Sequence, residues 1–185
     1  MRNPIDRLWS GYLYFCPPHK WDDSKRAQEN FLQIVASTFH HQVVDAMKAF
    51  HSCIHQNNSL FYCTAIIGSY DSFHLYCKRV RLGIGMYYVH LVKWFSVFPR
   101  EQIHVIKYED MVANPSSTVD RAFEFLDIQR DSNYETIQDN VKSNEWEKGF
   151  KMLPKTRILL TEFYHPYNVK LAEFLEDRHF LWDET

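Results

Sequence analysis

The first ten residues carry the side chains best suited to bind an anion. Pro4 fixes its own φ and favours an extended Asn3, so a helix is predicted to begin at about Pro4 or Ile5. A helix start offers free N–H groups and the positive end of its dipole, to which Arg2 and Ser10 would add a charged fork and a hydroxyl donor. These residues indicate a phosphate-binding site. An ordinary loop-to-helix junction, with Arg2 solvated and Ser10 bonded to the backbone, is the alternative that stays open.

The elements that must position these residues follow from the apolar spacing along the chain. Helices are predicted over residues 4–15, about 24–41, 42–51, 82–98, 115–126 and 155–176. The last is predicted as one helix or as a bent pair with a break at Pro166. A short, mostly buried strand is predicted over 103–108. A strand followed by an acidic turn and a helix is a βα unit, which is typical of an α/β sheet.

The composition narrows the function classes. The 185 residues suffice for one domain with a core, and a net charge of −2 leaves no basic field for nucleic acid. With five glycines there is no Walker loop or dinucleotide-binding loop. The most apolar stretch, 82–98, is interrupted by a histidine and a lysine, which favours a buried helix over a membrane span. His51 and His55 flank Cys53, but no second ligand pair follows, so no metal is expected.

Family resemblance enters at the same N-terminal motif. Sulfotransferases that use 3′-phosphoadenosine 5′-phosphosulfate (PAPS) share a motif that binds its 3′-phosphate. The N-terminal residues resemble this motif, with the spacing Arg2-Asn3-Pro4-x-x-Arg7-x-x-Ser10. The Golgi glycosaminoglycan sulfotransferases are similar also at Tyr12-Leu13-Tyr14-Phe15, Arg81-Leu82-x-x-Gly85-x-Tyr87, Trp94-x-Ser96-Val97-Phe98 and Tyr108-Glu109-Asp110. The resemblance implies a P-loop-NTPase-like sulfotransferase fold of the α/β class, helix-rich with a short parallel sheet. It also implies that Arg2 and Ser10 bind the cofactor.

The resemblance implies an enzyme that transfers sulfate from PAPS to a hydroxyl group of a sulfated glycosaminoglycan. The acceptor it indicates is the 6-hydroxyl of N-acetylgalactosamine 4-sulfate in chondroitin or dermatan sulfate. A heparan sulfate sulfotransferase is the alternative within the enzyme class. A non-catalytic remnant that binds glycan or nucleotide is the alternative outside it.

Members of this family carry a cationic phosphosulfate loop and a catalytic carboxylate before the Arg-Asn-Pro motif. The resemblance therefore implies that residues 1–185 are the C-terminal part of a single sulfotransferase domain, truncated at the N-terminus, with the catalytic residues upstream. The full-length protein is expected in the Golgi lumen, as a type II membrane protein held by an N-terminal anchor. The chain alone is expected not to catalyse transfer, because binding a 3′-phosphate does not stabilise charge at the sulfuryl group.

A second cofactor contact is implied near the C-terminal helix. In related heparan sulfate 3-O-sulfotransferases, a Lys-Gly-Arg loop before a proline contacts the nucleotide phosphate. Lys148 and Gly149 match that loop, Phe150 occupies the place of the arginine, and one extra residue precedes Pro154. The resemblance implies that Lys148 and Gly149 bind the cofactor, and an ordinary solvated turn is the alternative.

The cysteines indicate the cellular compartment in which the protein folds. Cys53 and Cys63 bracket a polar turn that contains the N-glycosylation sequon Asn57-Asn58-Ser59. A short disulfide loop with a sequon suits a secretory lumen, whereas reduced thiols packed as small apolar residues are the alternative. Related sulfotransferases carry a cysteine pair in a similar place, and this resemblance favours the disulfide.

Overall fold

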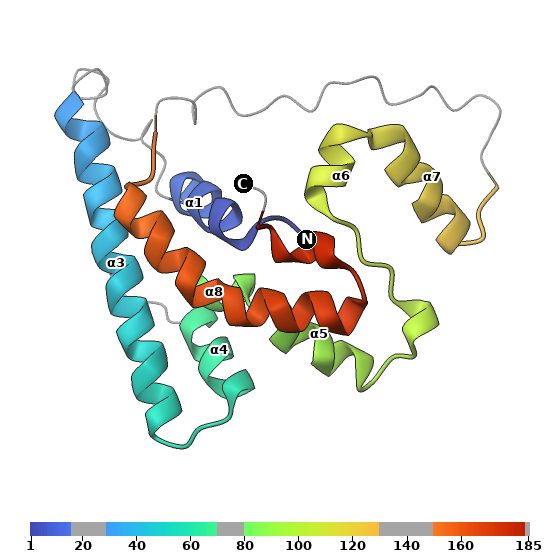
Figure 1. The fold of residues 1–185 in the computed structure, drawn as a ribbon, viewed down its shortest axis with the longest axis horizontal. Coiled ribbons are helices and arrows are strands. Elements are labelled where there is room, and N and C mark those ends of the chain that lie inside the picture. The colour runs from blue at the N-terminus through green and yellow to red at the C-terminus, as the bar shows by residue number, and fades with distance from the viewer. Residues whose placement is uncertain (16–28, 70–79, 130–149, 184–185) are drawn as a thin grey trace.

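The structure is a computed structural model that describes residues 1–15, 29–69, 80–129 and 150–183, and these ranges are largely helical (Figure 1). The α-helices are α1 (Pro4–Phe15), α3 (Glu29–His55), α4 (Leu60–Ser69), α5 (Tyr87–Phe95), α6 (Tyr108–Ala113), α7 (Pro115–Phe125) and α8 (Pro154–Leu175). Short 3₁₀ helices are η2 (Leu82–Gly85), η3 (Arg100–Gln102) and η5 (Arg178–Leu181). Within the described ranges, no helix is both long and apolar enough to cross a membrane.

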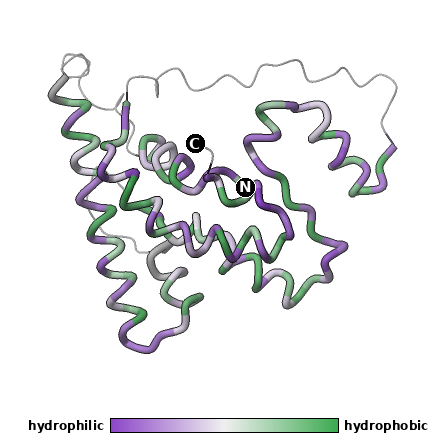
Figure 2. The backbone as a smooth tube through the Cα atoms, viewed as in Figure 1, coloured by the Kyte–Doolittle hydropathy of each residue, from purple (hydrophilic) through white to green (hydrophobic). Residues whose placement is uncertain are grey.

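Helices α1, α3, α4, α5 and α8 enclose the main apolar core. Figure 1 shows α3 along one side of the molecule, with α8 running from it across the centre. Hydrophobic and hydrophilic residues are interspersed along both helices (Figure 2), as amphipathic helices require. The buried side chains of this core include Leu8, Tyr12, Leu13, Phe31, Phe39, Phe50, Leu82, Met86, Leu160 and Tyr164. A smaller cluster joins α5, α8 and η5 through Leu91, Leu171, Ala172 and Phe180.

Helices α3 and α8 are continuous at two points where the sequence predicts or allows a break. The predicted boundary at residues 41–42 does not exist, and α3 runs unbroken to His55. Phe31, Val35, Phe39 and Val43 recur every four residues and are all buried, so one apolar stripe continues through that point. Of the two alternatives for 155–176, the break at Pro166 is wrong and the single helix is confirmed, because α8 includes this proline. Pro166 is exposed, so water can solvate the carbonyl that its missing N–H leaves without a partner.

The segment 82–98 forms less helix than its hydrophobicity predicts. It divides into η2 and α5, which meet at Met86 with φ −83° and ψ 61°, outside the helical region. Two glycines in η2 lower the helix propensity there. The residues after Phe95 form a turn ahead of Pro99, and a proline disfavours helix in the residue before it.

No β-strand is assigned within the described ranges, so the short parallel sheet stays a prediction. Residues 103–107 are extended at both ends, with φ −121° at Ile103 and −81° at Lys107, but they are half-buried or exposed rather than mostly buried. Their described backbone partner is Met1, whose nitrogen donates to Ile106 O and whose carbonyl accepts from the Tyr108 N–H. Bonds to residues on either side of Lys107 follow the parallel-strand pattern. A single pair of this kind is too short to form a sheet.

The structure links Cys53 on α3 to Cys63 on α4 by a disulfide, as predicted, with their Cα atoms 5.7 Å apart. The bond closes the turn between the two helices. Asn57 lies at that turn, exposed and with φ 60°, and Ser59 caps α4 by accepting a bond from the Tyr62 N–H at 3.2 Å. The sequon is therefore displayed on a short, covalently closed loop.

Gly85 marks the closest approach between η2, α1 and α8. A Cβ atom at this position would lie 2.9 Å from the Tyr164 ring and hydroxyl and 3.0 Å from Pro4 Cβ. Tyr164 cannot retreat freely, because it is fully buried and its hydroxyl donates to Leu82 O at 2.9 Å. The absence of a side chain at residue 85 thus sets how near α8 lies to the start of α1.

We expect Gly85→Ala to lower the free energy of unfolding by about 1–3 kcal/mol, the cost of overpacking a core. Gly11→Ala is the matched control, because its Cβ would meet nothing within 4 Å. Because alanine has a higher helix propensity than glycine, Gly11→Ala in α1 should raise the free energy of unfolding by about 0.5–1 kcal/mol. Denaturant unfolding of both variants of the full-length protein measures the difference. A neutral Gly85→Ala would show that the approach of Tyr164 to Pro4 is looser than described.

Candidate functional site

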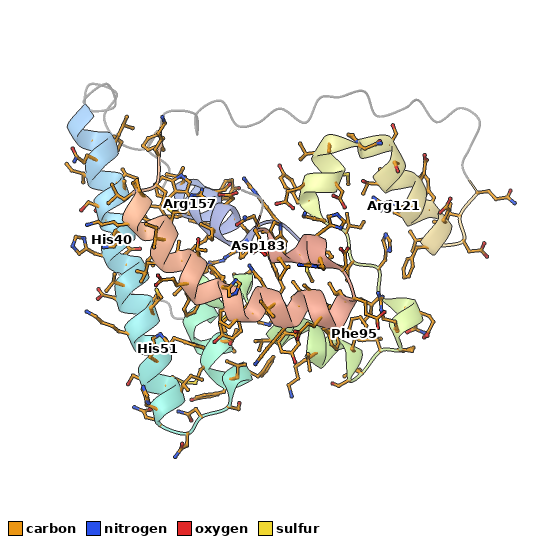
Figure 3. The ribbon with its side chains drawn as sticks, viewed as in Figure 1. His40, His51, Phe95, Arg121, Arg157 and Asp183 are labelled. Atoms are coloured by element: carbon orange, nitrogen blue, oxygen red, sulfur yellow. A yellow bond between two sulfur atoms is a disulfide. The ribbon has the colours of Figure 1, made fainter. Side chains whose placement is uncertain are left out.

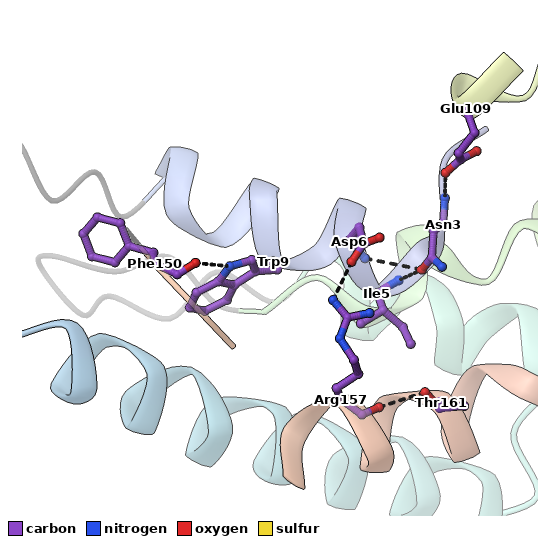
Figure 4. A network of polar contacts seen from close by, with 8 residues as sticks. All are labelled: Asn3, Ile5, Asp6, Trp9, Glu109, Phe150, Arg157 and Thr161. Carbon is purple, nitrogen blue, oxygen red and sulfur yellow. Dashed lines mark hydrogen bonds and ion pairs between the residues drawn. The ribbon is translucent and has the colours of Figure 1, made fainter. Parts of the chain in front are cut away.

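The start of α1 is built by Asn3 and Pro4, as the sequence predicts. Pro4 is the first helical residue, and Asn3 Oδ1 accepts bonds from the N–H groups of Ile5 at 3.0 Å and Asp6 at 3.4 Å (Figure 4). The Asn3 carbonyl accepts from the Arg7 N–H at 2.9 Å. The first-turn amides are therefore occupied, and the expectation that they are free to bind an anion is wrong. Any anion bound here must be held by side chains.

Arg2 is the cation nearest this helix start. Its side chain is half-buried, and its guanidinium carbon lies 5.0 Å from the centroid of the Tyr108 ring, a cation–π geometry. Among the described residues, no carboxylate forms an ion pair with Arg2. The aromatic contact orients the guanidinium without providing the ion pair that a carboxylate would form.

The peptide unit between Arg2 and Asn3 is bonded on both sides. The Tyr87 hydroxyl, on α5, donates to Arg2 O at 2.9 Å, and the Asn3 N–H donates to Glu109 Oε1, on α6, at 2.7 Å. Glu109 Oε2 is buried and has no hydrogen-bond partner among the described residues. Burial raises the pKa of Tyr87, against the opposing influence of Arg7 and of its bond to Arg2, so the hydroxyl stays protonated and donates at neutral pH. Tyr87 and Glu109 were not among the predicted site residues.

Helix α1 is also fixed to η2 and α8. Arg7 donates from Nη2 to Arg81 O at 2.9 Å, and Arg157 on α8 forms an ion pair of 2.7 Å with Asp6 (Figures 3 and 4). The charge of Arg7 also acts on the buried Tyr164 hydroxyl, but burial outweighs it and raises the pKa of Tyr164. Arg7 thus serves the packing of α1, although it belongs to the motif that carries the family resemblance.

Ser10 lies at the end of the second turn of α1, where it is half-buried and makes contacts of its own. The adjacent Trp9 donates from Nε1 to Phe150 O at 3.4 Å (Figure 4). The Phe150 ring packs edge-on against Phe31, with centroids 6.3 Å apart. Lys148 and Gly149 lie outside the described residues, but Phe150, the next residue in the chain, is therefore held beside α1.

Among the described residues, the histidine pair singled out in the sequence belongs to no group of metal ligands. His51 and His55 are exposed on α3, and Cys53 between them is consumed by the disulfide. Across the parts of the chain that the structure describes, no group of three or more His, Cys, Asp or Glu side chains is placed to hold a metal ion.

Comparison with known proteins identifies relatives along the whole chain. Carbohydrate sulfotransferase 15 of Mus musculus is 31% identical over 191 residues, which cover 100% of this chain and 30% of that protein. Carbohydrate sulfotransferase 15 of Nototodarus sloanii is 31% identical over 141 residues, 73% of this chain and 85% of that protein. The bifunctional heparan sulfate N-deacetylase/N-sulfotransferase 2 of Homo sapiens is 23% identical over 109 residues, 49% of this chain and 12% of that protein. No solved structure matches.

The chain spans about 30% of the length of the mammalian carbohydrate sulfotransferase 15 relatives. The family model of the sulfotransferase domain matches residues 1–165, which include the whole N-terminal motif and most of α8. This match and the 31% identity to a relative that the chain largely covers show that the chain belongs to the sulfotransferase domain family.

Proposed function

We propose that Arg2 and Ser10 bind the 3′-phosphate of PAPS in a glycosaminoglycan sulfotransferase. The observation that carries the proposal is the arrangement of Arg2. Its backbone is bonded on both sides, its guanidinium lies over Tyr108, and no described carboxylate neutralises it. A half-buried arginine of this kind has its charge and its planar donor fork available for a phosphate.

Ser10 and the segment after Gly149 support the same site. Ser10 lies six residues beyond Pro4, about 9 Å along a helix that rises 1.5 Å per residue. A long arginine side chain and a phosphate group can together bridge that span. We assign Lys148 and Gly149 to the same nucleotide, and the support is the bond that holds the neighbouring Phe150 to Trp9, one residue before Ser10.

The role of these residues is to bind and orient the donor. PAPS supplies an activated sulfuryl group when it is bound. Arg2 and Ser10 would hold the opposite end of the nucleotide, so they contribute affinity and alignment rather than stabilisation of charge at sulfur. We propose that residues 1–185 form the C-terminal part of one sulfotransferase domain in a longer protein, and we assign no residue of this chain to activation of the acceptor.

The acceptor is proposed from the family resemblance. We propose the 6-hydroxyl of N-acetylgalactosamine 4-sulfate in chondroitin or dermatan sulfate, and the relatives that cover the whole chain, the carbohydrate sulfotransferases 15, support a carbohydrate acceptor. Heparan sulfate is the second candidate acceptor, supported by the similarity to a heparan sulfate N-sulfotransferase over half of the chain. It ranks second because the identity to that protein and the share of this chain it covers are both lower than for the carbohydrate sulfotransferases 15.

The compartment is proposed from the α3–α4 turn. A disulfide between Cys53 and Cys63 persists in an oxidising lumen, and the exposed Asn57 at the tip of the turn fits an N-glycosylation site. Both features support a Golgi-lumenal enzyme, held in the membrane by an anchor outside these residues.

Arg2→Ala in the full-length protein should weaken binding of adenosine 3′,5′-bisphosphate by about 1.5–3 kcal/mol, the scale of a hydrogen bond to a charged group. Affinity for adenosine 5′-phosphate, which lacks the 3′-phosphate, should change little. Titration calorimetry with both nucleotides measures this, and Arg121→Ala on the exposed face of α7 is the matched control. Equal affinity of wild type and Arg2→Ala for the bisphosphate would remove Arg2 from the site.

The acceptor is tested by transfer of radiolabelled sulfate from PAPS with the full-length protein. We expect incorporation into chondroitin 4-sulfate at carbon 6 of the hexosamine, detected by disaccharide analysis. Preferential labelling of heparan sulfate would favour the second candidate. Nucleotide binding without transfer to either polymer would favour the non-catalytic remnant.

Peptide mapping of protein made through the secretory pathway tests the compartment. Without reductant, Cys53 and Cys63 should appear in one linked species, and enzymatic release of N-glycans should convert Asn57 to aspartate. Asn57→Gln should remove one glycan and leave the disulfide intact. Free thiols at both cysteines, or the absence of glycan from Asn57 in all of the protein, would contradict the lumenal proposal.

A further inference from the structure

We infer that Tyr87 and Glu109 are positioning residues that fix the direction of Arg2 by holding the Arg2–Asn3 peptide unit from both sides. This inference rests on the proposed function, because it assigns to Arg2 the binding of the nucleotide 3′-phosphate. Neither residue belongs to the N-terminal motif. Tyr87 is 85 residues from Arg2, and Glu109 is 106 residues from Asn3.

The geometry leaves this peptide little freedom. Its carbonyl accepts from the Tyr87 hydroxyl at 2.9 Å, and its N–H donates to Glu109 at 2.7 Å, so rotation of the peptide plane would break both bonds. Pro4 restricts the backbone of Asn3 from the other side, because the residue before a proline is confined to extended conformations. The peptide unit before Arg2 is held as well, because the Tyr108 N–H donates to the Met1 carbonyl. With the peptide units on both sides of Arg2 held, the Cα–Cβ bond of Arg2 points in one direction.

The bonds from Tyr87 and to Glu109 differ in strength, so we expect the Glu109 substitution to cost more nucleotide affinity than the Tyr87 substitution. The Tyr87 hydroxyl is a neutral donor to a neutral carbonyl, whereas Glu109 offers a carboxylate, and bonds to charged groups are worth roughly twice as much. Glu109→Ala would also leave the N–H of the buried Asn3 without the carboxylate that accepts its bond. Both bonds are part-buried, so they are partly shielded from competition with water.

If Tyr87 and Glu109 only packed the core, their substitution would lower stability but would not selectively weaken binding of the nucleotide that carries a 3′-phosphate. Tyr164 provides the comparison within the same core, because its hydroxyl also donates to a backbone carbonyl at 2.9 Å, that of Leu82, and it does not touch the Arg2–Asn3 peptide. Tyr164→Phe and Tyr87→Phe thus remove the same group from the same kind of bond. Only the second change releases Arg2.

The experiment measures the affinity of the full-length protein for adenosine 3′,5′-bisphosphate and for adenosine 5′-phosphate. We expect Tyr87→Phe to weaken binding of the bisphosphate about threefold to tenfold and Glu109→Ala about tenfold or more, with binding of the monophosphate unchanged. Glu109→Gln keeps an oxygen acceptor for the Asn3 N–H and should remain within about threefold of wild type. Tyr164→Phe should lower the melting temperature without separating the two nucleotides.

A double-mutant cycle with Arg2→Ala tests whether the effect passes through Arg2. In the Arg2→Ala background, Tyr87→Phe should cause no further loss of bisphosphate affinity. Additive losses, or equal losses for both nucleotides, would overturn the positioning role. The same measurements keep the two proposals apart. If Arg2→Ala itself has no effect, the proposed function fails, whereas an effect of Arg2→Ala without one of Tyr87→Phe or Glu109→Ala refutes only this inference. Should Glu109→Ala fail to fold, Tyr87→Phe and Glu109→Gln still decide the question.

Discussion

The bond between the Asn3 N–H and Glu109 is the contact on which the N-terminal site depends. Helix α1 has 12 residues, a length at which an isolated helix is marginal in water, so its position must come from tertiary contacts. Glu109 and Tyr87 hold the peptide before the helix, Arg7 attaches it to η2, and the Asp6–Arg157 pair attaches it to α8. The ion pair is exposed and adds little, whereas the bond to Glu109 is charge-assisted and half-buried. The site is thus assembled from segments that are far apart in the sequence.

A second helix of the same chain shows what local sequence alone can build. Asn114-Pro115 begins α7 with the same two residues that begin α1, and Asn114 Oδ1 caps that helix by accepting from the Ser117 N–H at 3.2 Å. The backbone N–H of Asn114 donates to Asp110 O in the preceding turn, so it remains within its own segment. The N–H of Asn3 instead reaches a carboxylate on α6. Identical capping chemistry therefore produces an ordinary helix junction in one place and an anchored candidate site in the other.

This comparison explains how much the sequence could predict. The helix starts at Pro4, Pro115 and Pro154 were predicted within about a residue, because proline geometry is a local constraint. The disulfide was predicted from the family resemblance, since the sequence itself left reduced thiols as an alternative. The division of 82–98 was missed, because the apolar pattern outweighed the two glycines that lower the helix propensity of η2. The assignment of Arg2 and Ser10 to the cofactor came from a motif and stays a prediction. Tyr87 and Glu109 lay inside quoted family blocks, but nothing local indicated that both would bond to one peptide.

The placement of Glu109 on α6 has a thermodynamic consequence. Helices α6 and α7 lie apart from the other helices in Figure 1, and among the described residues α7 packs chiefly on α6. A pair with so little shared core opens at a lower free energy than the rest of the domain. Each opening carries away both the carboxylate that holds Asn3 and the ring beneath Arg2. A nucleotide that requires the closed arrangement stabilises it by mass action. Occupancy of a site on α1 and protection of amides on α6 and α7 from hydrogen exchange are then two measures of one equilibrium.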